Sequence, residues 1–344
     1  MEALTKYLSN FKTLRIDRSH GHAPHKPVLL LSVLQAFQNN LITDQRIYIT
    51  PELVALFKSN WSLLVTSNHD CRFALPFFHL TSDKFWKLIP KPGFDNILQF
   101  KASMRSFVNL NAAVDCAVIE FDLFFLMKDK KSNSILQQFL LDEYFPETKN
   151  NFSNSSGGQQ NLFDDIEGKI LHEDAEEYRN EIKKLVQQRN EEEIFLRGSL
   201  FKREIPKIYN NTCCISGMKI DATISISMVD ACHIIPFSES YDDTISNGIA
   251  LCPNLHRAFD RGLIAIDNKY RIVVSNAFRE EESDYSIRKF EGNEILLPKQ
   301  QKYFPLIENL GWHKQNIFKN QVINARIQQN EEGYELAEIK NSII

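Results

Sequence analysis

The sequence has few cysteines and no long hydrophobic segment. Its six cysteines are too few and too irregularly spaced for the disulfide framework of a small secreted protein. Four fall in the stretch from Cys213 to Cys252, but Cys213 and Cys214 are adjacent and lack the spacing of a zinc-binding pair, so we expect no structural zinc. No window approaches the roughly 18 apolar residues of a membrane span, and the amino terminus lacks the apolar core of a signal peptide. We therefore expect a cytoplasmic protein without a membrane partner.

A large net charge is also absent. The chain carries 40 Lys and Arg against 44 Asp and Glu, a net charge of −4, whereas domains that bind nucleic acid are usually basic. Residues 161–200 hold 6 basic and 11 acidic residues, so this block has a net charge of −5 and the rest of the chain sums to +1. The charge balance therefore neither excludes nor indicates a nucleic-acid partner.

Length and composition predict two folded domains. Hydrophobic residues make up 43% of 344 residues, which is enough to bury a core, and single cores rarely grow past about 250–300 residues. The segment NNFSNSSGGQQN, residues 150–161, is small and polar, which favours a flexible linker. Apolar residues at helical spacing then predict an amphipathic helix over 164–197, with a second helix over 198–209. We expect a first domain, a linker with its connector helix, and a second domain at residues 1–149, 150–196 and 197–344.

The first domain is predicted to mix helices and strands, which gives the chain an α+β fold. HKPVLLLSVLQAFQNN predicts a buried helix with Pro27 in its first turn, where the missing N–H costs nothing. RIYIT predicts a short strand, after which Thr50 caps a helix that begins at Pro51. FALPFFHL and KFWKLIP are typical of the two strands of a hairpin. A closing helix is expected over residues 134–145.

The second domain contains a predicted strand–loop–strand–helix unit. The β-branched run ATISISMVDACHII predicts a strand that ends at His233, and Asn247-Gly248 predicts a turn into a returning strand, IALC. PNLHRAFDRG then predicts a helix that closes at Gly262. His233, Asn247 and His256 therefore fall in one unit, 14 and 9 residues apart.

These residue types suit the hydrolysis of a phosphodiester. A neutral imidazole at a strand end can take a proton from water, since histidine titrates near neutral pH. Asn247 can hydrogen-bond that ring or a loop carbonyl, and His256 can bind a divalent cation that stabilises charge on the phosphate. Alternate positions of a strand share a face, so Asp230 and Cys232 point together, opposite to His233. We expect the Asp230 carboxylate to reach a metal ion that His256 also holds.

Three motifs in this order resemble the HNH, or ββα-metal, endonucleases: CHIIP, SNGIALC and LHRAFDRGLIAI. The flanking segments LRGSLFKREIPKIYNNTCCISG and LLPKQQKYFPLIENLGWHKQNIF extend the resemblance to about residues 197–320. It implies a C-terminal ββα-metal nuclease domain with Mg²⁺ or Mn²⁺ as cofactor. By the same resemblance, His233 is the general base, Asn247 the middle motif residue, and His256 the third, which binds the catalytic metal.

The second metal ligand is where the chain departs from the motif. Many members of the superfamily have Asp directly before the base, and this chain has Cys232 there. Asp230 on the same strand face is therefore the candidate ligand beside His256, and the alternatives are Cys232 itself or a water molecule in the gap. On the predicted helix, Arg257 and Arg261 are candidates for contacts with phosphate, although arginines on a helix surface are commonly only solvated.

Two segments of the first domain predict contacts with DNA. RSHGHAPHKPVLLL places imidazoles and cations before a helix start, where free N–H groups favour phosphate. FALPFFHLTSDKFWKL places aromatic residues beside a proline and a histidine. Together they resemble the N-terminal DNA sulfur-binding domain of McrA-like type IV restriction endonucleases, which join such a domain to an HNH domain and cut phosphorothioate-modified DNA. The candidate DNA-binding residues are Arg18, His25, Lys26, Leu75, Pro76 and His79.

The resemblance implies a prokaryotic restriction enzyme that acts on modified, phosphorothioated double-stranded DNA. A homodimer is expected, because cleavage of both strands needs two active sites. The mark could also be a methylated or hydroxymethylated base, and two alternative functions are open from the sequence. One is a sequence-specific HNH restriction or homing-type endonuclease that is indifferent to modification, and the other is a DNA-binding regulator with an inactive HNH fold.

Overall fold

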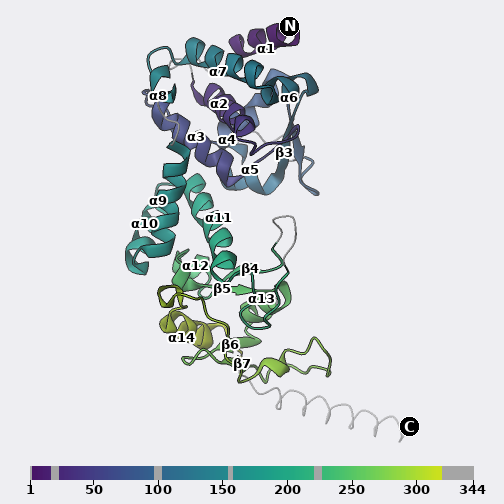
Figure 1. The fold of residues 1–344 in the computed structure, drawn as a ribbon, viewed down its shortest axis with the longest axis vertical. Coiled ribbons are helices and arrows are strands. Elements are labelled where there is room, and N and C mark those ends of the chain that lie inside the picture. Colours follow the sequence, from purple (N-terminus) through teal and green to yellow (C-terminus); the bar gives the residue numbers. More distant parts are fainter. Residues whose placement is uncertain (1, 17–22, 97–102, 154–157, 221–226, 320–344) are drawn as a thin grey trace, which may run out of the picture. The chain divides into compact units, whose positions relative to one another are not determined.

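The computed structural model describes residues 2–16, 23–96, 103–153, 158–220 and 227–319. The chain divides into two compact units (Figure 1). The N-terminal unit comprises Met1–Glu167 and Lys184–Arg197, and the C-terminal unit comprises Gly168–Lys183 and Gly198–Ile344. Within the described ranges, no helix combines the length and the apolar character that crossing a bilayer requires.

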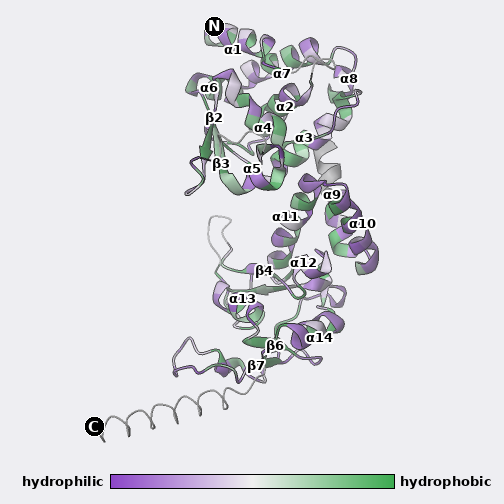
Figure 2. Ribbon diagram, turned by 180° about the vertical axis from the view of Figure 1, so that it is seen from behind, coloured by the Kyte–Doolittle hydropathy of each residue, from purple (hydrophilic) through white to green (hydrophobic). Residues whose placement is uncertain are grey.

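The N-terminal unit packs helices around a small antiparallel sheet. The sheet has the order β1-β3-β2, with β1 at Arg46–Tyr48, β2 at Trp86–Pro90 and β3 at Val114–Ile119. Both outer strands run antiparallel to β3, and Figure 2 shows hydrophobic residues along β2 and β3. The described helices of this unit that precede the connector are α1 (Glu2–Lys12), α2 (His25–Gln38), α3 (Pro51–Leu64), α4 (Ala74–His79), α5 (Phe107–Ala113), α6 (Phe121–Lys128), α7 (Lys130–Tyr144) and α8 (Lys149–Ser153).

Helix α2 forms the centre of the core of this unit. Its residues from Val28 to Leu34 are all fully buried, because α3, α4, α6 and α7 pack around a helix that is apolar on every side. Helix α3 is capped as predicted, with Leu53 N donating to Thr50 Oγ1 at 3.2 Å. The predicted buried helix, the strand in RIYIT and the capped helix are therefore confirmed. The closing helix is also confirmed as α7, although it begins earlier, at Lys130.

The predicted hairpin is wrong in its first strand. FALPFFHL forms α4 and continues into a 3-10 turn, Leu80–Asp83, and only KFWKLIP contains a strand, β2. Phe73 and Phe77 lie one helical turn apart, are fully buried and stack with ring centroids 5.4 Å apart. A short run that is buried on every side suits a helix as well as a strand, so hydrophobic periodicity cannot distinguish the two.

The C-terminal unit contains the predicted strand–loop–strand–helix unit. Strand β4 (Asp230–His233) pairs antiparallel with β5 (Gly248–Leu251), and α13 (Pro253–Asp260) packs against both. Strand β4 ends at His233 as predicted but begins only at Asp230, and residues 222–226 of the predicted strand lie outside the described residues. Gly262 follows α13 in the left-handed conformation expected there, with φ of +70°. The other described strands and helices that follow the connector are β6 (Ile264–Ile266), β7 (Ile272–Val274), α12 (Phe237–Ser240) and α14 (Ile307–Asn316).

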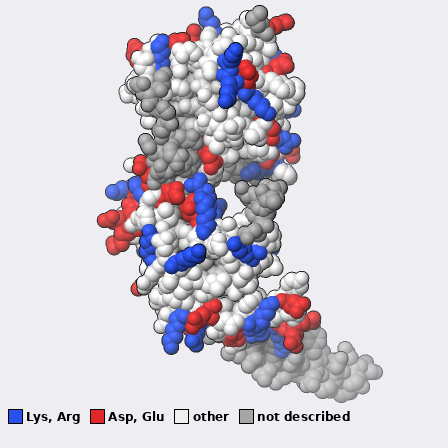
Figure 3. Space-filling model, in the orientation of Figure 1, with Lys and Arg blue, Asp and Glu red and all other residues white. Residues whose placement is uncertain are grey.

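Three helices occupy the region of the predicted linker and connector: α9 (Gly158–His172), α10 (Ala175–Gln187) and α11 (Glu191–Ile208). The prediction of one helix over 164–197 and another over 198–209 is wrong, and the predicted linker overlaps α8 and the start of α9. Asp174 Oδ1 caps α10 by accepting from Glu176 N at 2.8 Å, and Arg189 separates α10 from α11 with a φ of +54°. Acidic side chains gather over the region of α10 in Figure 3, in agreement with the predicted acidic block.

Two glutamates at the start of α11 cap other helices of the N-terminal unit. Glu191 accepts from Ser106 Oγ at 2.8 Å and from Val108 N at 3.0 Å, at the N-terminus of α5. Glu192 accepts from Phe73 N at 3.0 Å, at the N-terminus of α4. Carboxylates satisfy the free N–H groups of a helix start and complement its dipole, so these bonds stabilise the starts of α4 and α5.

Candidate functional site

The strand–loop–strand–helix unit brings the three motif residues into one region. His233 is the last residue of β4 and pairs with Gly248, the first residue of β5. Asn247 lies in the 3-10 turn directly before β5, and His256 lies on α13, which packs against both strands. The side chains of His233 and His256 are about one-fifth and one-quarter exposed, so both rings are partly accessible from solvent.

The His233 ring is held from two directions. Its Nε2 lies 2.8 Å from Oδ1 of Asp243, a carboxylate that is almost completely buried. The ring of Phe201 stacks on the imidazole, with centroids 4.0 Å apart and planes within 11° of parallel. Neither partner follows from the sequence motif, because Phe201 lies on α11 and Asp243 in the loop after α12, and only the tertiary fold brings them to His233.

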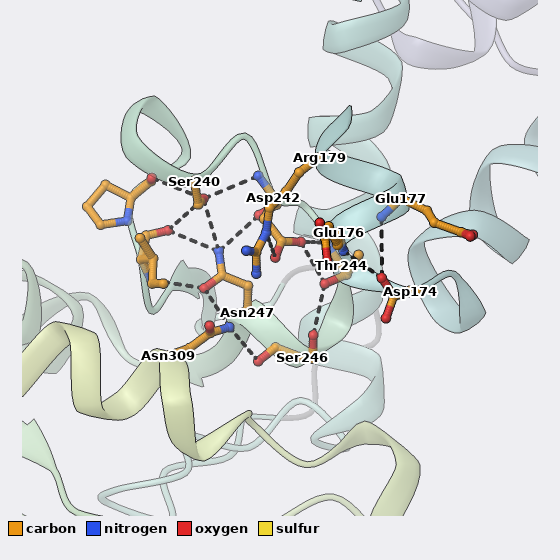
Figure 4. Close-up of polar contacts among 12 residues, drawn as sticks. Asp174, Glu176, Glu177, Arg179, Ser240, Asp242, Thr244, Ser246, Asn247 and Asn309 are labelled. Atoms are coloured by element: carbon orange, nitrogen blue, oxygen red, sulfur yellow. Dashed lines mark hydrogen bonds and ion pairs between the residues drawn. The ribbon is translucent and has the colours of Figure 1, made fainter. Parts of the chain in front are cut away.

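Asn247 organises the loop between β4 and β5 and is completely buried. Its Oδ1 accepts from Ile235 N, and its Nδ2 donates to the carbonyl oxygens of Ile235 and Asp242, each at 3.0 Å. Asn309 of α14 donates to the same Oδ1 at 3.2 Å (Figure 4). The sequence allowed Asn247 to bond either the His233 ring or the loop backbone, and the observed bonds are those to the loop backbone.

The same loop is fastened to α10 through Asp242, whose side chain is fully buried. Asp242 Oδ1 accepts from Thr244 N at 2.9 Å and from Thr244 Oγ1 at 2.6 Å. Its Oδ2 forms an ion pair with Arg179 Nε at 3.2 Å, as Figure 4 shows. Burial raises the pKa of Asp242, while the bonds from Thr244 and the charge of Arg179 act in the opposite direction.

A candidate metal centre lies where α13 packs against β4. The ligand atoms of Cys232, His256 and Asp260 lie within 4.8 Å of one another. The predicted ligand Asp230 also reaches this group, with its Oδ2 3.5 Å from His256 Nδ1, and Asp260 Oδ2 lies 3.5 Å from His256 Nε2. Asp260 was missed by the sequence analysis, although residues four apart on a helix share a face and the spacing from His256 contains that signal.

The oxygen and nitrogen donors of this group fit a hard divalent cation. Carboxylates suit Mg²⁺ and Mn²⁺, and an imidazole suits several divalent metals. Cys232 is a poor ligand for such an ion, because a soft sulfur donor suits other metals, whereas Mg²⁺ and Mn²⁺ prefer oxygen. Its Sγ instead donates to Asp260 Oδ1 at 3.8 Å. The pair that fits the ion is therefore His256 and Asp260, while Asp230 lies at the other nitrogen of the same ring.

A pocket of about 970 Å³ opens in the N-terminal unit. It brings together five of the predicted DNA-binding residues, namely His25, Lys26, Leu75, Pro76 and His79. Arg18 lies outside the described residues. The pocket is also lined by exposed arginines and a histidine that the sequence analysis missed, because they come from three separate segments: Arg15, His69, Arg72 and Arg105. Arg257 and Arg261 lie exposed at the surface of the C-terminal unit.

Lys26 lines the pocket from a buried position. Its Nζ donates to Arg15 O at 2.7 Å, to Ser82 Oγ at 2.9 Å and to Asp83 Oδ2 at 2.5 Å. An ammonium has three protons, so all of its donors are engaged within the protein. Burial lowers the pKa of Lys26, and the adjacent Asp83 acts against that shift. The structure thus shows Lys26 supporting the pocket wall.

His25 is a neutral group at the pocket. Its Nε2 lies 2.9 Å from the carbonyl oxygen of Asp70, and its ring centroid lies 4.7 Å from that of Trp61. Burial lowers the pKa of His25 to about 4, so the imidazole is uncharged at neutral pH. Together with Leu75 and Pro76, it makes part of the lining uncharged, whereas the exposed arginines supply positive charge.

Two antiparallel strands followed by a packed helix, with a histidine at the strand end and a second histidine on the helix, define a ββα nuclease site. Residues 213–267 match the model of the HNH endonuclease family. The protein therefore carries an HNH endonuclease domain in its C-terminal unit.

Comparison with solved structures found a further similarity. A solved structure described as "Modification dependent TagI restriction endonuclease" is similar with a TM-score of 0.26 and 18% sequence identity. The similarity covers 34% of this chain and 37% of that one. The search of curated proteins found no match.

Proposed function

We propose that the protein is a Mg²⁺- or Mn²⁺-dependent endonuclease that restricts modified double-stranded DNA, with the phosphorothioate as the mark. The observation that carries the nuclease part is the placement of His233 at the end of β4 in the unit whose α13 supplies His256. The observation that supports recognition of a mark is the pocket that gathers His25, Leu75, Pro76 and His79.

In this proposal, different residues of the HNH domain carry out different parts of phosphodiester hydrolysis. His233 takes a proton from the attacking water. A divalent cation held by His256 with Asp260, or with the predicted ligand Asp230, would supply charge stabilisation to the phosphate and the leaving oxygen. Asn247 holds the β4–β5 loop in shape, and Arg257 and Arg261 contact the DNA backbone.

The pocket suits a phosphorothioate for chemical reasons. A sulfur atom is larger and less hydrated than the oxygen it replaces, so contact with Leu75 and Pro76 favours it. The group remains anionic, and exposed arginines at the same pocket attract it. Lys26 contributes by stabilising the pocket wall through its ion pair with Asp83. Arg18 contributes positive charge near the phosphate.

The test compares two duplexes of the same sequence, one phosphorothioated and one unmodified. With Mg²⁺ or Mn²⁺ we expect cleavage of the modified duplex, and none in EDTA. His233→Ala is expected to abolish cleavage and keep binding. Leu75→Asp is expected to abolish the preference for the modified duplex, because it replaces the apolar contact with sulfur by a carboxylate, while Asp284→Asn serves as an exposed control.

Each alternative predicts a different result. Equal cleavage of both duplexes would support a nuclease that is indifferent to modification. Binding without cleavage under any metal condition, with no effect of His233→Ala, would support a regulator with an inactive fold. The proposed homodimer is tested by sedimentation, and a monomer that breaks both strands in one encounter would reject it.

A further inference from the structure

The close packing of α11 against β5 explains how Phe201 reaches His233. Gly248 pairs with His233 across the two strands. A Cβ at Gly248 would lie 2.2 Å from Ile205 Cδ1 and 2.8 Å from Phe201 Cε2, which is far inside van der Waals contact. Only glycine permits α11 to approach β5 this closely. Gly248 is therefore needed for the packing of α11 over the site as well as for the turn after Asn247.

The contact with Asp243 selects one form of the His233 ring. A carboxylate can only accept hydrogen bonds, so the short contact from Asp243 Oδ1 places a proton on Nε2. In the neutral ring this leaves the lone pair on Nδ1. The nitrogen that can take a proton from water is then Nδ1, and its direction is set by the ring plane.

The ring plane is set in turn by Phe201, and the loop that carries Asp243 is braced on both sides of that residue. Asp242 is bonded to Arg179 and Thr244, and Thr244 Oγ1 lies 2.9 Å from Ser246 Oγ. Asp243 itself is only 1% exposed, so the surrounding atoms restrict its side chain to the contact with His233.

We propose that Asp243 and Phe201 are positioning residues for His233: Asp243 fixes the tautomer with a basic Nδ1, and Phe201 fixes the plane in which that nitrogen faces the water. The mechanistic consequence rests on the proposed role of His233 as general base. The contacts themselves do not, so the tautomer can be tested without cleavage.

The first measurement is NMR of the full-length protein labelled with ¹⁵N at histidine, with His233→Ala used to identify the signals of this ring. Wild-type protein is expected to show His233 protonated at Nε2. Asp243→Asn is expected to change this pattern, because an amide can also donate to Nε2. A wild-type ring protonated at Nδ1 would overturn the proposal even if Asp243→Asn failed to fold.

The second measurement is single-turnover cleavage with saturating modified DNA, together with DNA affinity and melting temperature. Asp243→Asn is expected to slow cleavage by up to about 10⁴-fold, the loss seen when the carboxylate that orients a catalytic histidine becomes an amide. Phe201→Leu is expected to slow it about 10-fold. Affinity should stay unchanged in both, and Asp284→Asn should match wild type.

The outcomes separate this inference from the proposed function. Wild-type cleavage rates in Asp243→Asn and Phe201→Leu would overturn the positioning roles. If His233→Ala cleaves normally, or if wild-type protein cleaves neither duplex, the proposed function fails, and the tautomer measurement still decides whether Asp243 sets the state of the ring.

Discussion

Arg179 of α10 forms an ion pair with Asp242, a residue whose side chain is completely buried in the loop between β4 and β5. Through this contact the connector region supports the loop that Asn247 organises in the HNH domain. A buried carboxylate is costly unless its charge is compensated, so the contribution of Arg179 is measurable.

Arg179→Ala is expected to destabilise the C-terminal unit by about 1–3 kcal/mol, because Asp242 keeps only its bonds from Thr244. One-third of the Arg179 side chain is exposed, so the loss should be below the roughly 3–5 kcal/mol of a fully buried pair. Urea unfolding measures it, and cleavage should slow as the loop loosens. Lys183→Ala, an exposed change on the same helix, is the control, and equal stability of the two variants would contradict the prediction.

Gly248→Ala is expected to destabilise the same unit by about 1–3 kcal/mol, since the added methyl group overlaps Ile205 and Phe201. The second change Ile205→Val removes the nearest overlapping atom and should restore part of the loss. Chemical denaturation of the single and double variants measures both effects. Gly168→Ala meets no atom within 4 Å on α9 and should be neutral or slightly stabilising. If Gly248→Ala behaves like Gly168→Ala, the close approach of α11 is wrong.

Lys26 and the pocket arginines are expected to respond differently to salt. Each phosphate contact adds about 0.9 to the slope of log affinity against log salt concentration on duplex DNA. Lys26→Met should leave this slope unchanged, because its donors are engaged internally, whereas Arg72→Ala and Arg105→Ala should each reduce it. Binding titrations at several salt concentrations decide the matter.

Lys26→Met should instead destabilise the N-terminal unit by about 3–5 kcal/mol, because it leaves Asp83 buried without its cation. Replacing both residues, as Lys26→Met with Asp83→Leu, should cost less. A reduced salt slope in Lys26→Met, with unchanged stability, would restore the direct phosphate contact expected from the sequence.

Stability is expected to fall as the pH drops below neutral. Burial lowers the pKa of His25 and of His313 from the ordinary 6.5 to about 4 in the folded protein. The unfolded chain therefore binds more protons between these values, so the stabilisation is complete above about pH 6.5 and is lost as the pH falls through 4.

Denaturation at pH 7, 5.5 and 4 measures this dependence for each unit. His313 is stacked on Phe259 at 3.6 Å and bonded to its carbonyl oxygen at 3.1 Å. His313→Gln should flatten the dependence in the C-terminal unit, and His25→Gln should do so in the N-terminal unit. If the stability of both variants fell with decreasing pH as much as that of the wild type, groups other than these two histidines would cause the loss.

The elements that were predicted best from the sequence are those determined by residues close together in the chain. The buried helix from His25 is apolar on every side and long, Thr50 and Pro51 form a helix start, and Gly262 takes the left-handed conformation that glycine favours. In the same way, the β-branched run that ends at His233, the Asn247-Gly248 turn and the helix start at Pro253 predicted the strand–loop–strand–helix unit.

The elements that sequence predicted wrongly depend on burial. Residues 73–80 form a helix because Phe73 and Phe77 stack inside a core contributed by other segments. The connector breaks into three helices at Asp174 and Arg189, where a side-chain cap and a positive φ override a continuous apolar spacing.

The sequence by itself determined the chemistry available to this protein: an HNH motif with its histidines in order, few cysteines, and a front domain with imidazoles and cations near a helix start. Only the tertiary structure decided how those groups are used. It paired Lys26 with Asp83 and placed Asp243 and Phe201 against His233. These contacts join residues far apart in the chain or in different elements, and their partners are selected by packing and by the need to satisfy buried polar groups, which no local pattern records.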